Sequence, residues 1–190
     1  MFKSKVILLA WFFLISVAGQ AKEAALVVPA KKVGSTFKFK WDYQDFPVKL
    51  ELFSLQNPKF ARVGMMGKLK SKVNDFLASQ ISSEEMYVPE GDLVKFAIVV
   101  HNTTAKKIYF HLVPHEITPP EYSLGAKFIC MCFGHIYSVP PGQYFYRIVS
   151  LQNVTPQVGR EFTIRHKVIA IDPKDSFKDS KEYLDDREVQ

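Results

Sequence analysis

The chain contains very little cysteine. Two cysteines occur in 190 residues, Cys130 and Cys132, and a single residue separates them. This scarcity excludes a framework of several disulfides and a four-cysteine zinc site. The C-x-x-C sequence that thiol-disulfide catalysts place at the start of a helix is also absent, which argues against an enzyme of that kind.

Motifs of several common enzymes and nucleotide-binding proteins are missing as well. The sequence has no G-x-S-x-G element and no glycine-rich phosphate loop. Its 25 basic residues exceed its 19 acidic residues, for a net charge of +6, but they form no compact run. We therefore expect neither nucleic-acid binding nor catalysis, and look for a binding function.

No apolar run is long enough to cross a bilayer. The longest extends over about 14 residues, 6–19, whereas a spanning helix needs about 20. Basic residues precede this run, and the small residues Gly19, at its end, and Ala21, just after it, form a small-x-small site, as in a secretory signal peptide. We expect cleavage after Ala21 and a periplasmic chain. The alternative is an uncleaved segment that anchors the protein in the inner membrane.

Alternating apolar and polar residues predict a protein built from strands. Turn-forming Pro, Gly, Asp and Asn separate the segments. The expected strands are 36–41, 48–53, 93–101, 108–113, 128–133, 144–151 and 161–171. Seven or more short strands with frequent turns favour an all-β fold, an immunoglobulin-like antiparallel β-sandwich that follows the N-terminal signal or anchor segment.

The same pattern divides the chain into four parts. Residues 1–21 are the signal or anchor, and 22–85 hold the first strands and a short helical or loop insertion. Residues 86–172 form the main sandwich, and 173–190 are a polar tail. The insertion is where a helix is plausible, because apolar residues recur there at intervals of three and four, namely Leu69, Val73, Phe76 and Leu77.

The cysteine pair is the strongest chemical signal. In the expected strand 128–133, Cys130 and Cys132 share one face, because side chains alternate along a strand. Two adjacent thiolates suit a soft ion of low coordination number, and Cu(I) is such an ion. One pair cannot surround the ion, so a further ligand has to come from elsewhere.

Two other readings of the pair remain open, a redox-active disulfide and an inert pair. A structural disulfide between Cys130 and Cys132 closes a loop of about three residues, which gains little in the chain-entropy model. Two positions apart in an extended strand, the Cα atoms are also about 6.5–7 Å apart, at the far end of disulfide geometry.

Further ligands are available among the histidines and methionines. His135, just after the pair, and His115, in the proline-rich segment before it, are the best additional candidates, with Met131 as a thioether alternative. Pro114 rules out a helical H-x-x-x-H zinc motif between His111 and His115. The remaining histidines are expected on the sheet surface or as satisfied core residues, namely His101, His111 and His166.

A set of short motifs surrounds the pair in a recognisable order. They are V-P-E-G at 88–91, H-N-T-T at 101–104, P-H-E-I-T-P-P at 114–120, C-M-C-F at 130–133 and V-P-P-G at 139–142. In this order the segment 87–151 resembles the CtaG family, the copper-delivery assembly factors of cytochrome c oxidase. Met131 stands where that family usually has Phe, and the family's third cysteine is absent.

The resemblance implies a copper chaperone that holds Cu(I) on Cys130 and Cys132 and receives it from a donor protein. The client is a copper enzyme, either a haem-copper cytochrome oxidase subunit or another exported enzyme. We expect copper loading to promote a homodimer, in which a second chain supplies the missing ligands. The competing outcome is a monomer that completes its site with His135 or His115. The alternative function is a metal-free sandwich module, such as an exported chaperone or adhesin subunit.

Overall fold

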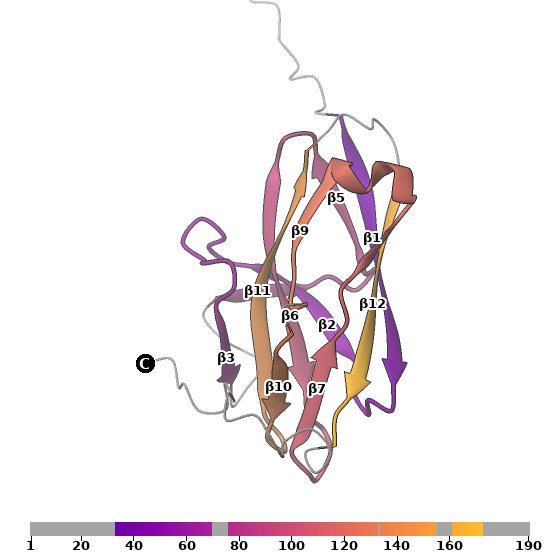
Figure 1. Cartoon of the computed structure of the whole chain (residues 1–190). Helices are drawn as coiled ribbons and strands as arrows, with labels where there is room; N and C mark the ends of the chain where they lie inside the picture. The colour runs from indigo at the N-terminus through magenta and orange to yellow at the C-terminus, as the bar shows by residue number, and fades with distance from the viewer. Residues whose placement is uncertain (1–32, 70–75, 133, 155–160, 173–190) are drawn as a thin grey trace, which may run out of the picture. The chain divides into compact units, whose positions relative to one another are not determined.

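The computed structural model of the chain describes residues 33–69, 76–132, 134–154 and 161–172 (Figure 1). Within these ranges the chain forms strands and one short 3-10 helix, η1. The elements are β1 (Gly34–Gln44), β2 (Leu50–Leu55), β3 (Met66–Leu69), β4 (Leu77–Gln80), β5 (Glu85–Pro89), β6 (Leu93–His101), β7 (Ile108–Leu112), β8 (Glu116–Thr118), η1 (Pro120–Gly125), β9 (Ala126–Ile129), β10 (Ile136–Val139), β11 (Tyr144–Asn153) and β12 (Glu161–Ala170).

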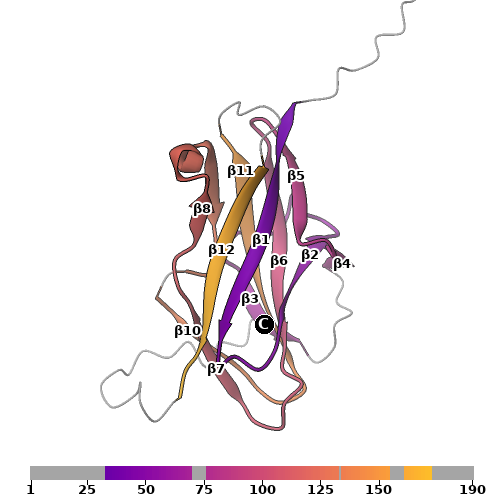
Figure 2. The ribbon, with the colours of Figure 1, turned by 90° about the vertical axis from the view of Figure 1, so that its right-hand side faces the viewer.

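The strands form two packed sheets, which confirms the expected all-β sandwich. The first sheet has the order β10-β7-β12-β1-β5, with β8 also paired to β12. The second has the order β3-β11-β6-β2-β4, with β9 also paired to β11. All pairings are antiparallel except that of β1 with β12, which lie side by side in parallel (Figure 2).

The apolar alternation in the sequence explains the core between the sheets. In β12 the buried residues Phe162, Ile164 and Val168 alternate with exposed or half-buried ones. Large buried side chains from both sheets meet there, including Phe37, Phe96 and Phe110. Because β12 and β11 supply inward-facing positions from opposite sheets, polar residues at those positions also enter the interior.

Two local predictions are wrong. The strand expected at 128–133 ends at Ile129, so the cysteines follow β9 instead of lying within it. The suggested helix does not include Leu69 and Leu77, since Leu69 ends β3 and Leu77 begins β4, both of which join the second sheet. Residues 70–75 of the expected helical or loop insertion, Val73 among them, lie outside the described residues. Half-buried strands with irregular apolar spacing resemble a helical face over so short a window.

In the ranges that the structure describes, no helix has the length and hydropathy needed to span a membrane. The expected signal or anchor segment 1–21, and the tail 173–190, lie outside those ranges.

Candidate metal centre

The cysteines lie where the chain passes from one sheet to the other. Before them β9 pairs with β11 of the second sheet, and after them β10 pairs with β7 of the first. Met131 turns its side chain into the core and is fully buried, which places its two neighbours on the opposite side of the bend. The Cα atoms of Cys130 and Cys132 are consequently 5.6 Å apart, closer than an extended strand holds them.

Cys130 and Cys132 form a disulfide in the structure. The backbone N–H of Cys132 donates a hydrogen bond to Cys130 Sγ at 3.2 Å. Cys130 is buried and Cys132 is half-buried, so Cys132 is the more accessible sulfur. Because thiolates are the metal ligands, the pair has to be reduced before it can bind an ion.

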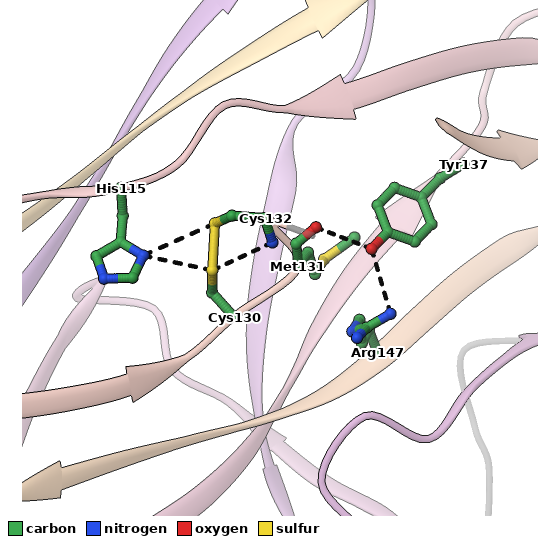
Figure 3. The surroundings of a disulfide bond; sticks show 6 residues. All are labelled: His115, Cys130, Met131, Cys132, Tyr137 and Arg147. Carbon is green, nitrogen blue, oxygen red and sulfur yellow. Dashed lines mark hydrogen bonds between the residues drawn. A yellow bond between two sulfur atoms is a disulfide. The ribbon is translucent and has the colours of Figure 1, made fainter. Parts of the chain in front are cut away.

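His115 faces both sulfur atoms. It lies between β7 and β8, in the segment that leaves the first sheet, and is half-buried. Its Nδ1 is 3.3 Å from Cys130 Sγ and 3.7 Å from Cys132 Sγ. Figure 3 draws both contacts as dashed lines. The sequence prediction that His115 lies near the pair is thus met by the geometry.

His166 is the fourth member of the cluster and comes from the middle of β12. Its position continues the inward alternation of Phe162 and Ile164, and its side chain is fully buried. Neither Nδ1 nor Nε2 has a hydrogen-bond partner among the described residues. Buried polar groups are nearly always satisfied, so a histidine with two unpartnered nitrogens requires an explanation, and a metal ion provides one.

Both histidines are held neutral by their surroundings. Burial lowers the pKa of His115 below its usual value. Burial, followed by the proximity of His115, lowers the pKa of His166 to about 3. Neutral imidazoles have the lone pair that a metal requires, so neither ring has to lose a proton to bind an ion at neutral pH.

Aromatic rings enclose the inner side of the cluster. Phe128 contacts His115 edge-on at 5.2 Å and His166 at 5.6 Å between ring centroids. Trp41, the register partner of His166 in β1, stacks on the His166 ring at 5.1 Å. These rings limit the access of water from within the sandwich, leaving Cys132 and His115 as the exposed side.

Together these residues form a compact donor set. The ligand atoms of His115, Cys130, Cys132 and His166 all lie within 4.8 Å of one another. Two sulfurs and two imidazole nitrogens suit soft or borderline ions such as Cu(I) and Zn(II). The described residues therefore contain a Cys-x-Cys pair with histidines close by, in an arrangement compatible with metal binding.

The other predicted ligands lie elsewhere. His135 packs against Tyr137, and its backbone carbonyl lies 3.1 Å from His111 Nδ1; it does not belong to the four-residue cluster. The Met131 side chain packs in the core, and Figure 3 shows its sulfur on the side of Tyr137, away from the cysteines.

Sequence reasoning missed His166, which it treated as a surface or satisfied core residue. The available signal was its place on the inward side of an apolar strand, where a histidine needs a partner. The pairing of β12 with β7 and β8, which brings it to His115, joins residues far apart in sequence and leaves no local pattern.

Two comparisons with known proteins bear on this site. No curated protein matches the chain. A family described as "Domain of unknown function (DUF8709)" matches residues 35–171, a range that runs from β1 to just beyond β12 and includes all four cluster residues. Since the match extends over more than half of the sequence, the chain belongs to the DUF8709 family.

Proposed function

We propose that the protein is an exported copper chaperone that carries Cu(I) on Cys130, Cys132, His115 and His166. The observation that carries the proposal is the fully buried His166, whose unpartnered nitrogens lie in the same cluster as the two sulfurs. A purely structural disulfide gives no reason for a buried imidazole without hydrogen-bond partners beside it. A bound cation does, because it satisfies both histidines at once.

The donor set favours copper over zinc. Structural zinc sites usually separate paired cysteines by two to four residues, which leaves room for tetrahedral geometry. Here only one residue separates them. A closely spaced sulfur pair with nearby imidazoles suits Cu(I), which accepts two to four ligands and does not demand a regular tetrahedron.

Loading begins with reduction of the Cys130–Cys132 disulfide by an external dithiol. Two electrons and two protons pass to the pair, which becomes two thiols, and the reductant becomes a disulfide. Binding of the ion then displaces the thiol protons. His115 and His166 lose none, since burial keeps both neutral.

Transfer proceeds from the exposed side of the site. Cys132 and His115 are half-buried, whereas Cys130 and His166 are buried. A client's ligands therefore replace Cys132 or His115 first, while the two inner ligands retain the ion until the exchange is complete. This order lets the ion pass between proteins without entering water.

The direct test is Cu(I) titration of the reduced protein under anaerobic conditions. We expect one ion per chain, and loss of most binding in Cys130→Ser and in Cys132→Ser. Undiminished binding by the double serine variant contradicts the proposal. Competition with Zn(II) identifies the metal, because a preference for zinc would make this a structural metal site instead of a carrier.

Export and the client are further parts of the proposal. The resemblance of segment 87–151 to the CtaG family, together with the signal-like segment 1–21, supports periplasmic delivery to a cytochrome oxidase or another exported copper enzyme. Mass spectrometry of the protein purified from its host should find Lys22 at the N-terminus. An N-terminus that retains the apolar run indicates a membrane anchor instead.

The alternative is a metal-free sandwich module. Such a module has the same fold, but the four-residue cluster has no role in its function. Replacing His166 and both cysteines should therefore leave its binding to partner proteins unchanged. Copper content of the protein isolated under reducing conditions separates the two functions.

A further inference from the structure

Arg147 is a buried charge that the metal cluster does not use. It lies on β11, on the inward-facing side that also presents Phe145 and Val149 to the main core, and it is only 6 % exposed. Burying a guanidinium group is unfavourable unless its hydrogen bonds are well placed. Its position inside the sandwich therefore calls for a reason.

Arg147 contacts a residue next to the cysteine bend. Its Nη1 donates a hydrogen bond to the Tyr137 hydroxyl at 3.2 Å, and its guanidinium lies 5.9 Å from the centre of the Tyr137 ring. Tyr137 lies on β10 and is also buried. Its hydroxyl in turn donates to the backbone carbonyl of Met131 at 2.8 Å.

The chain of hydrogen bonds ends at a cysteine sulfur. The Met131 carbonyl belongs to the same peptide group as the Cys132 N–H, which donates to Cys130 Sγ at 3.2 Å. A peptide group is planar, so a bond that fixes the direction of its oxygen also fixes the direction of its N–H. Figure 3 shows this relay on one side of the cysteines and His115 on the other.

We propose that Arg147 and Tyr137 are positioning residues, which hold the Met131–Cys132 peptide so that its N–H stays on Cys130 Sγ while both sulfurs face His115. The role of these residues in metal binding rests on the proposed copper function, whereas the hydrogen-bond relay itself is present in the structure without an ion. Each hydrogen bond polarises the next, so the arginine charge strengthens the final N–H···S bond. Such outer contacts orient thiolate ligands and tune how tightly they hold a metal.

The substitution Tyr137→Phe removes one oxygen atom and breaks the relay. The matched control is Tyr146→Phe, which also removes one hydroxyl oxygen. Tyr146 precedes Arg147 on β11 and therefore lies on the opposite face of that strand, where it packs in a separate apolar cluster. Arg147→Lys retains a cationic donor, and Arg147→Met removes the charge from a side chain of similar length.

The first measurement needs no metal. In the reduced, metal-free full chain, the Cys132 amide should shift in the proton–nitrogen NMR spectrum and exchange with solvent faster in Tyr137→Phe than in Tyr146→Phe. Arg147→Met should reproduce the change, and Arg147→Lys should restore most of the native signal. An unchanged Cys132 amide in both Tyr137→Phe and Arg147→Met overturns the proposal, whatever the protein does with copper.

The second measurement is the Cu(I) dissociation constant, determined by competition with a chromophoric chelator. We expect Tyr137→Phe and Arg147→Met to raise it by about 10- to 100-fold, the usual effect of losing an outer-shell partner, while Tyr146→Phe leaves it unchanged. Equal affinities in Tyr137→Phe and Tyr146→Phe overturn the role in metal binding. If the unmodified chain binds no Cu(I), the proposed function fails, and the amide measurement still decides the relay.

Discussion

The indole of Trp41 stacks on the imidazole of His166, with 5.1 Å between the ring centroids, and the two residues are register partners on the parallel strands β1 and β12. This contact ties the only tryptophan of the described residues to the proposed inner ligand. Events at His166 should therefore be visible in the fluorescence of Trp41.

We predict that Cu(I) quenches this fluorescence. A cation on His166 makes the ring electron-poor, so it accepts an electron more readily from the excited indole. In Trp11→Phe, which leaves Trp41 as the only tryptophan, emission should fall as Cu(I) is added to the reduced protein. The cysteine-to-serine double variant is the control, and equal quenching there would show that the signal does not report the site.

A second prediction separates His166 from His135. Losing an outer-shell partner typically weakens metal binding by about 10- to 100-fold, so losing a direct ligand by His166→Gln should weaken Cu(I) binding by at least about 100-fold. His135→Gln should have no effect, because His135 lies outside the cluster. Chelator competition measures both values. If His135→Gln weakened binding more than His166→Gln, the histidine ligand would be His135 and not His166.

A third prediction concerns the oligomeric state. Since His115 and His166 supply nitrogen ligands from the same chain, the copper-loaded protein should be a monomer. The double variant His115→Ala, His166→Ala retains only two thiolates and should form the copper-linked dimer that a bare pair requires. Light scattering at about 10–100 μM protein, above a micromolar dissociation constant, distinguishes the two. A copper-dependent dimer of the unmodified chain would contradict the intrachain site.

His166 should reduce the stability of the metal-free protein. Its two buried nitrogens have no partner in the described part of the chain, and an unsatisfied buried polar group costs about 1–3 kcal/mol. His166→Leu should therefore raise the free energy of unfolding by about 1–2 kcal/mol at neutral pH while abolishing tight copper binding. Urea denaturation of the reduced protein measures it, with Val168→Ala as a control that opens a cavity and lowers stability. A destabilised His166→Leu variant would indicate a native partner for the imidazole.

The same residue predicts a pH dependence. The folded-state pKa of His166 is about 3, because of burial and the nearby His115, and lies below the usual 6.5. The unfolded chain therefore binds this proton first as the pH falls, so the stability is complete above about 6.5 and is lost progressively towards 3. Between pH 7 and pH 5 the loss should be about 2 kcal/mol. Urea titrations of the metal-free protein at both values should show a smaller difference in His166→Leu, and an equal difference would assign the effect to other groups.

The sequence predicted the fold better than the site. Strands are visible as patterns within one short segment, whereas the site depends on contacts between segments that are far apart in the sequence. Alternation within one segment predicted β6 at its observed bounds, 93–101. It failed at 128–133, where β9 ends at Ile129 and the chain bends with the Met131 side chain buried in the core. It also missed β8, because Glu116–Thr118 pairs with β12 from within a proline-rich segment where no strand was expected.

Within the site, local sequence identified the cysteine pair and suggested His115. Two thiols one residue apart are a local signal, and His115 lies in a motif close to them. His166 could not be found in this way, because its place beside them is set by the pairing of β12 with β1, β7 and β8. Only the assembled sheets bring these segments together.

The crossing of the cysteine segment from one sheet to the other has a mechanical consequence. Both histidines project from the first sheet and its connection, whereas the cysteines follow a strand of the second. An ion held by all four residues, as we propose, would cross-link the two sheets, so that a small movement of one sheet against the other would change its coordination. We therefore expect metal loading to stiffen the protein, and we expect a client that separates the two sheets at this point to weaken the site and take the ion in the same movement.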